Sequence, residues 1–137
     1  MLRNILAVVA GVLVAGLLVA AVETVSNSFF PPAVDLSDGD MDALRAHVGS
    51  LPVTAFLMIL FGWSLGAFTG GWLTERIAKT GKPTLSLVFA GVFLILIALN
   101  LFSIPHPIWM MVIGLLLPPA MAYAGWKIAA RPGKIVV

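Results

Sequence analysis

The sequence predicts an all-α integral membrane protein with four transmembrane helices in an antiparallel bundle. Hydrophobic residues make up 61% of its 137 residues and charged residues only 10%, whereas a soluble domain carries about 25% charged residues. Four separate apolar stretches also reach the length of about 20 residues that a helix needs to cross the hydrocarbon core. Most connections between these stretches are short, and short connections join antiparallel neighbours.

The first span is predicted over residues 5–22. This apolar run is longer than the core of a usual signal peptide, and the Glu23-Thr24-Val25 sequence makes a poor cleavage site, so we expect the span to be retained. An outer connection follows over residues 26–50, and within it Asp40 is expected to cap a short interfacial helix over residues 41–48. The apolar side of this helix would carry Met41, Leu44 and Val48, and the more exposed side Asp42, Arg45 and His47.

The three remaining spans are predicted over residues 53–73, 85–102 and 108–128. The first of these three helices is expected to continue beyond the membrane. In that continuation Glu75 and Lys79 lie four residues apart, and a solvated ion pair of this kind contributes little to stability.

The basic residues predict the orientation of the chain. If the N-terminus lies inside, seven of the eight Lys and Arg residues fall on the inner side and only Arg45 falls outside. The positive-inside rule therefore places both termini in the cytoplasm. The inner basic residues also favour anionic lipid head groups, at about 1 kcal/mol per charge. They are Arg3, Arg76, Lys79, Lys82, Lys127, Arg131 and Lys134, whereas the outer connection holds Asp35, Asp38, Asp40 and Asp42.

Small residues recur at four-residue steps in the first two spans. The second span carries Gly62, Gly66 and Gly70, and this spacing lets another helix backbone approach closely. The pattern predicts a helix-packing seam, either within one chain or between copies in a homo-oligomer. In the first span Ala7, Gly11 and Ala15 form one stripe, and Gly16 and Ala20 form a neighbouring one.

Two consecutive prolines, Pro118 and Pro119, interrupt the fourth span near its middle. Proline removes a backbone donor, so the carbonyls of Gly114 and Leu115 lose their usual helical partners. Ser64 of the second span is expected to lie at a similar depth and could supply a donor. The prolines predict either a kinked packing helix or a broken helix that lines an ion or substrate site.

Few residues in the spans could carry chemistry. Glu23, Asn100, His106 and, from the outer connection, His47 are expected to lie at a similar depth near the outer surface. Together they could relay protons or bind a divalent cation. The alternative is a polar rim that hydrogen-bonds the loops to the helix ends.

The composition excludes several other classes of protein. A net charge of +2 is too small for a nucleic-acid-binding face, and the absence of cysteine excludes disulfides and thiolate chemistry. No phosphate loop and no paired nucleophile and base is visible. The sequence therefore predicts no cofactor, no resident metal and no nucleic-acid partner, and it does not favour an enzyme.

Several short sequence motifs of the chain resemble those of other membrane proteins. They are the Phe29-Phe30-Pro31-Pro32 stretch after Glu23, Leu51-Pro52, Gly70-Gly71, Asn100-Leu101 and the run Ile104-Pro105-His106-Pro107-Ile108-Trp109. With these runs the sequence resembles short four-span bacterial inner-membrane proteins of unknown function. The resemblance implies the architecture and a bacterial inner-membrane location, but no activity.

The leading functional prediction is a small non-enzymatic membrane protein. It would associate with itself or serve as an accessory subunit of a larger membrane complex, because it has a glycine-faced helix and almost no buried charge. The alternative is a small homo-oligomeric channel or transporter for an ion or solute, with Glu23 and His106 at its outer mouth. A third hypothesis, a membrane enzyme acting on lipid at the outer face, rests on Glu23 and His106 alone.

Overall fold

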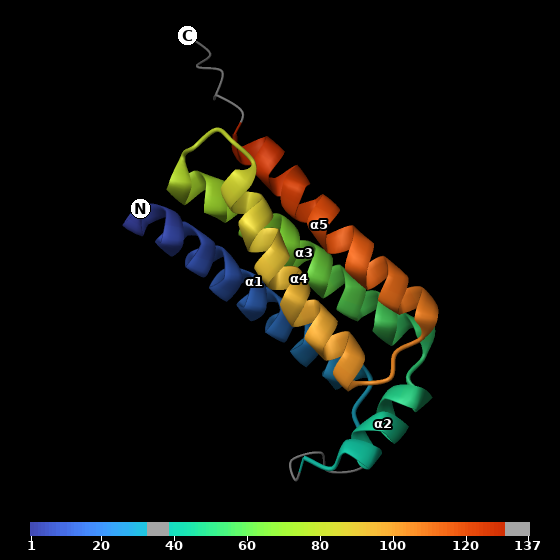
Figure 1. Cartoon of the computed structure of the whole chain (residues 1–137). Coiled ribbons are helices and arrows are strands. Elements are labelled where there is room, and N and C mark those ends of the chain that lie inside the picture. Colours follow the sequence, from blue (N-terminus) through green and yellow to red (C-terminus); the bar gives the residue numbers. More distant parts are fainter. Residues whose placement is uncertain (33–38, 131–137) are drawn as a thin grey trace.

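The computed structural model describes residues 1–32 and 39–130, and within them it contains five α-helices and no strand (Figure 1). The helices are α1 (Leu2–Phe29), α2 (Met41–Ser50), α3 (Val53–Ala78), α4 (Thr84–Ser103) and α5 (Ile108–Ala129). All except α2 are long and apolar enough to cross a membrane. The predicted all-α bundle with four membrane-spanning helices is confirmed, and the chain is a small multi-pass membrane protein.

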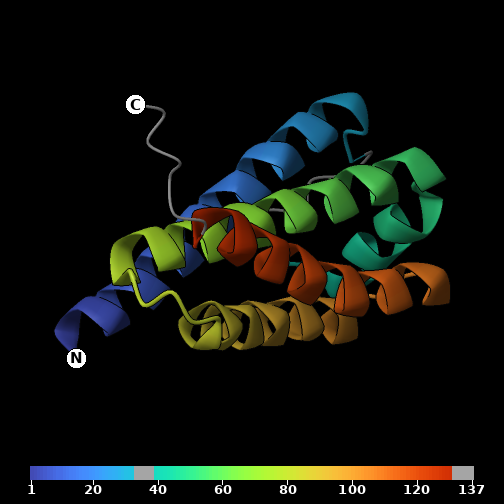
Figure 2. The same ribbon diagram turned by 90° about the horizontal axis from the view of Figure 1, so that it is seen from above.

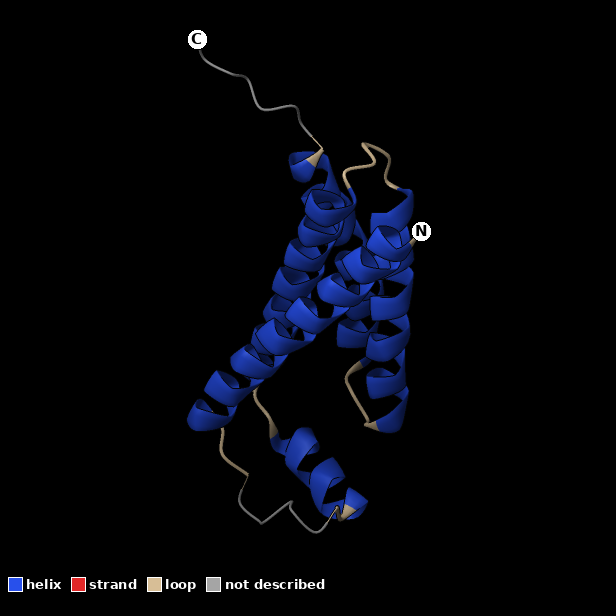
Figure 3. Ribbon diagram, turned by 90° about the vertical axis from the view of Figure 1, so that its left-hand side faces the viewer, coloured by secondary structure: helices blue, strands red, loops and turns tan. Residues whose placement is uncertain are grey.

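The four long helices alternate in direction, and α2 lies beyond one end of the bundle (Figure 1). We call this end the α2 end. The start of α1 and the end of α5 lie at the opposite end, which we call the terminal end. The helix α3 is central and contacts α1, α4 and α5. The helices α1 and α4 diverge toward the α2 end (Figures 2 and 3).

The helix α1 is longer than the predicted span at both of its ends. It continues to Phe29 because no helix-breaking residue comes before Pro31, and Phe30 leaves the helical conformation with φ −128° and ψ 64°. A residue before proline is driven out of the α region by steric clash with the proline ring. The outer connection is therefore shorter than predicted. Four charged residues discussed above lie outside the described residues, namely Asp35, Asp38, Arg131 and Lys134.

The glycine seam of α3 packs against α1 of the same chain. A Cβ atom added to Gly66 would lie 3.0 Å from the Ala15 carbonyl oxygen, and one added to Gly70 would lie 2.9 Å from the Gly11 carbonyl oxygen. Gly62 faces the side chain of Val22, whose Cβ atom would lie 3.1 Å from a Cβ atom added to Gly62. Because α1 already occupies this face, the seam belongs to packing within the chain and is not free for a second copy.

A second close approach joins α3 to α5. A Cβ atom added to Gly71 would clash with the backbone of Ala122, and one added to Gly125 would clash with the carbonyl oxygen of Phe68. Large side chains fill the remaining core between the helices. They include Trp63, Phe89 and Phe93, and each is at most 5% exposed. The bundle interior is therefore packed with side chains.

The helix α5 runs through both of its prolines without interruption. Pro118 is buried, and Pro119 is half-buried. Of the two predicted alternatives, the broken helix is therefore absent, and Ser64 does not donate across to α5. Its hydroxyl donates to the Leu60 carbonyl oxygen at 2.7 Å, because a serine in a helix reaches the carbonyl four residues earlier without needing a partner on another helix.

At the terminal end, Glu75 is buried, which corrects the prediction of a solvated pair with Lys79. Only 4% of Glu75 is exposed. Its carboxylate accepts a hydrogen bond from the Thr80 hydroxyl at 3.0 Å and another from the Gly81 N–H at 2.6 Å. Lys79 ends α3 in the left-handed conformation with φ 52°, and the chain then turns back over the carboxylate. The sequence spacing did not predict this turn.

Candidate functional site

The four candidate polar residues line one pocket between α2 and the end of the bundle. The pocket has a volume of about 230 Å³, and we call it the α2-end pocket. Glu23 comes from α1, His47 from α2, Asn100 from α4 and His106 from the connection between α4 and α5. Four separate segments of the chain thus bring polar side chains to one cavity.

Two further polar residues of the pocket, Ser26 and Asn27, were missed at the level of sequence. They follow Glu23 by three and four residues, and on a helix this spacing puts all three on one face. The sequence prediction ended the first span at residue 22 and placed Ser26 and Asn27 in the outer connection. Their position on the same helix face as Glu23 was therefore not recognised. Ser26 is 5% exposed, so this part of α1 belongs to the packed structure.

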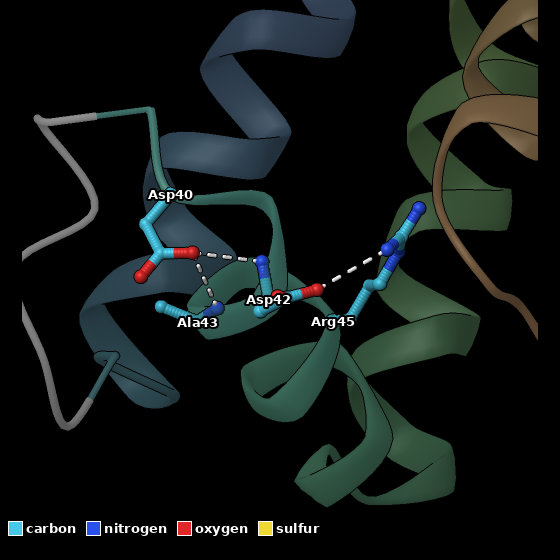
Figure 4. Close-up of polar contacts among 4 residues, drawn as sticks. All are labelled: Asp40, Asp42, Ala43 and Arg45. Carbon is cyan, nitrogen blue, oxygen red and sulfur yellow. Dashed lines mark hydrogen bonds and ion pairs between the residues drawn. The ribbon is translucent and has the colours of Figure 1, made fainter.

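The helix α2 covers the pocket, and its start is fixed by Asp40 (Figure 4). The Asp40 Oδ1 atom accepts hydrogen bonds from the N–H of Asp42 at 2.9 Å and from the N–H of Ala43 at 3.2 Å. The predicted cap is thus confirmed. Arg45 and Asp42 form an exposed ion pair at 3.2 Å, and such pairs contribute little.

One side of α2 faces the bundle. Val48 is buried, and Leu44 packs against the core. This contact turns His47 toward the pocket, where it is half-buried and not on the exposed side as predicted. Met41, which was predicted on the apolar side, is 42% exposed. The helix therefore contacts the bundle through Leu44 and Val48, which lie one turn apart, and not through Met41.

The imidazole of His106 has a defined orientation. Its Nδ1 atom lies 2.8 Å from the carbonyl oxygen of Ile104. A carbonyl oxygen only accepts hydrogen bonds, so Nδ1 is the donor in this pair. In a neutral imidazole the lone pair is then on Nε2. The Phe56 ring meets the imidazole edge-to-face, with 6.3 Å between the ring centroids. Both contacts hold the ring in place, and in its neutral form Nε2 is the atom that can accept a further hydrogen bond.

Glu23 and Asn100 both line the α2-end pocket. Within residues 1–32 and 39–130, the structure gives neither side chain a hydrogen-bond partner. Glu23 is half-buried and Asn100 is exposed, so both are accessible from the pocket. A carboxylate, an amide oxygen and an imidazole nitrogen therefore supply three acceptors in one cavity.

The charge at this end favours a positively charged ligand. Among the described residues at this end, Glu23, Asp40 and Asp42 are acidic and Arg45 is the one basic residue. Across the described part of the chain, no three His, Cys, Asp or Glu side chains are close enough to hold a metal ion.

Comparison of the chain with family models, with curated proteins and with solved structures gives no match. The site must therefore be interpreted from its own geometry. The resemblance to short bacterial inner-membrane proteins stays a prediction.

Proposed function

We propose that this protein binds a small organic cation with N–H donors in the α2-end pocket. The observation that supports the proposal is the convergence of Glu23, His47, Asn100 and His106 on one cavity of about 230 Å³. Acceptors on three of these side chains match a primary ammonium group, which has three donors. Hydrogen bonds that involve a charged group are about twice as strong as neutral ones.

The proposal includes the location of the pocket in the cell. The basic residues favour cytoplasmic termini, so the α2 end would face outward from a bacterial inner membrane. Basic residues at the terminal end, including Arg76 and Lys82, would meet anionic lipid head groups there. The pocket would then take its ligand from the outer aqueous phase or from the outer leaflet.

The other functions predicted from the sequence gain less support. Self-association or an accessory role was inferred from the glycine seam of α3, but α1 occupies that seam. A homo-oligomeric channel would need a pore between copies, because Phe89 and Phe93 fill the interior of a single chain. An enzyme acting on lipid would need a nucleophile with a paired base. Among the described residues, the Ser26 hydroxyl of the pocket has no hydrogen bond to an imidazole or a carboxylate.

The proposal is tested by titrating the detergent-solubilised protein with ethylamine and following side-chain NMR signals. We expect saturable shifts of the Asn100 amide and of the His47 and His106 ring protons. Ethanol, which has no charge, should shift them much less at the same concentration. The Glu23→Gln variant should weaken ethylamine binding roughly tenfold, because a charged hydrogen bond contributes about 1.5 kcal/mol or more.

The matched control is Asp42→Asn, which removes an acidic residue at the same end. Asp42 does not line the pocket, and its side chain is 92% exposed. Binding should therefore be nearly unchanged in this variant. Shifts that do not saturate, or an equal loss in Glu23→Gln and Asp42→Asn, would show general charge attraction and overturn the proposal.

A further inference from the structure

A second cavity adjoins the α2-end pocket and lies within the membrane-spanning part of the bundle. It has a volume of about 260 Å³ and lies between α1 and α4. Gly16, Val19 and Ala20 of α1 form one wall, and Phe93, Leu96 and Ile97 of α4 form the other. We call it the α1–α4 groove.

The groove and the α2-end pocket share two residues. Glu23 and Asn100 line both cavities, so the polar pocket continues into the apolar groove. Gly16 and Phe93 each lie seven residues before one of these shared residues, which is about 10 Å along a helix. The groove therefore extends roughly two helical turns from the polar pair toward the middle of the bundle.

The groove opens on the outer surface of the bundle, where lipid lies. Gly16 and Ala20 are exposed, and Leu96 is 48% exposed. A Cβ atom added to Gly16 would have no neighbour within 4 Å. The base is Trp63 of α3, which is 3% exposed. The divergence of α1 and α4 toward the α2 end leaves this space between them (Figures 2 and 3).

Resting on the function proposed above, we propose that the ligand is a membrane lipid with a primary ammonium head group. One acyl chain lies in the α1–α4 groove, and the head group lies in the α2-end pocket. The Glu23 carboxylate in the lining of the α2-end pocket complements the cationic ammonium group. The small side chains of Gly16 and Ala20 leave room for an acyl chain beside the aromatic base.

The head group is recognised by hydrogen bonds as well as by charge. A primary ammonium group donates to the Glu23 carboxylate, to the Asn100 amide oxygen and to Nε2 of His106. A trimethylammonium group has no donor and lacks these bonds. The site therefore selects phosphatidylethanolamine over phosphatidylcholine and over the anionic phosphatidylglycerol.

The experiment uses full-length protein in phosphatidylcholine nanodiscs with a small fraction of a photoreactive lipid. One probe is phosphatidylethanolamine with a diazirine at the middle of an acyl chain, and the other is phosphatidylglycerol with the same chain. Cross-linked peptides are identified by mass spectrometry. We expect the ethanolamine probe to label residues 16–20 and 93–97 roughly tenfold more than the glycerol probe, as a charged hydrogen bond would produce.

Two variants separate the groove from the pocket. Ala20→Leu fills the groove and should abolish this selective labelling, whereas ethylamine still shifts the Asn100 and His106 signals. Ala21→Leu is the matched control, because Ala21 is exposed on the same helix and does not line the groove. Its labelling should equal that of the unmodified protein.

The possible outcomes are distinguishable. Equal labelling by both probes means ordinary boundary lipid and overturns the lipid proposal. Ethylamine binding with no selective labelling overturns the lipid proposal but leaves the proposed function in place. If neither ethylamine binding nor selective labelling is observed, both the lipid proposal and the proposed function are overturned. Selective labelling that is lost in Ala20→Leu but kept in Ala21→Leu supports both.

Discussion

At the terminal end of the bundle, Glu75 is 4% exposed and its carboxylate accepts hydrogen bonds from Thr80 and Gly81. At the α2 end, Glu23 is half-buried and lines a pocket, and it has no hydrogen-bond partner within the described residues. Thr74 and Ser86 repeat the first pattern, since each hydroxyl donates to a backbone carbonyl of α3. The Glu75 carboxylate is therefore part of the hydrogen-bonded structure of the terminal end, whereas the Glu23 carboxylate lines a pocket without a partner among the described residues.

The largest expected effect tests the close packing near the terminal end. Gly71→Ala should destabilise the protein by about 3 kcal/mol or more, because the new methyl group meets the backbone of Ala122, which cannot move aside. Thermal unfolding in detergent measures this. Gly91 of α4 has open space around it, so Gly91→Ala should be neutral or slightly stabilising. Equal effects at the two positions would contradict the packing described for α3 and α5.

The structural role of Glu75 predicts the next largest effect. Glu75→Ala leaves the N–H of Gly81 without its acceptor and leaves the Thr80 hydroxyl with the Lys82 carbonyl oxygen as its acceptor. The variant should therefore cost about 2 kcal/mol of unfolding free energy. Glu75→Gln keeps one acceptor oxygen and should recover part of this loss. An unchanged unfolding temperature in both variants would show that the turn after α3 does not depend on this side chain.

The cap of α2 is expected to contribute less. Asp40→Ala should cost about 1 kcal/mol, because the N–H groups of Asp42 and Ala43 lose their acceptor. Amide hydrogen exchange at these two residues should accelerate, while exchange in α3 stays unchanged. Asp40→Asn keeps an acceptor oxygen and serves as the control. If exchange speeds up equally in both variants, the cap is not what holds the start of α2.

A small stabilisation is expected where α3 ends. Lys79 has a positive φ of 52°, a conformation that glycine adopts without steric cost. Lys79→Gly should therefore raise the unfolding free energy by up to about 1 kcal/mol. A decrease would mean that the lysine side chain makes a contribution larger than the backbone strain.

The smallest effect on stability is expected at the α2-end pocket. Glu23→Gln should change the unfolding free energy by no more than about 0.5 kcal/mol, because the carboxylate has no partner in the described structure to lose. The same variant should nevertheless weaken ethylamine binding roughly tenfold. A loss of stability as large as that of Glu75→Ala would assign Glu23 to the fold and remove the contrast between the two ends.

Much of the architecture could be predicted from the sequence. Long apolar runs fix the number of spanning helices, because only a helix satisfies its backbone within the bilayer. Depth along the chain also predicted that Glu23, Asn100, His106 and His47 lie at one level, and the structure brings them to one pocket. The Asp40 cap followed from its local residue pattern.

Other features depend on tertiary contacts that spacing does not reveal. Glu75 and Lys79 have the spacing of a surface ion pair, but the left-handed turn at Lys79 folds the chain back over the carboxylate. The sequence alone could not decide whether the glycine seam packs against a helix of the same chain or against a second copy. Both kinds of packing use the same small residues. The α1–α4 groove depends on the angle between two helices. The residues of one helix alone do not predict this angle.

The most direct test of the account is native mass spectrometry of the protein gently extracted from its own membrane. Lipids that remain bound are identified for the unmodified protein and for Glu23→Gln. The account predicts that the unmodified protein retains a lipid with a primary ammonium head group and that Glu23→Gln releases it. Retention of the same lipid by both proteins, or of anionic lipid alone, would contradict it.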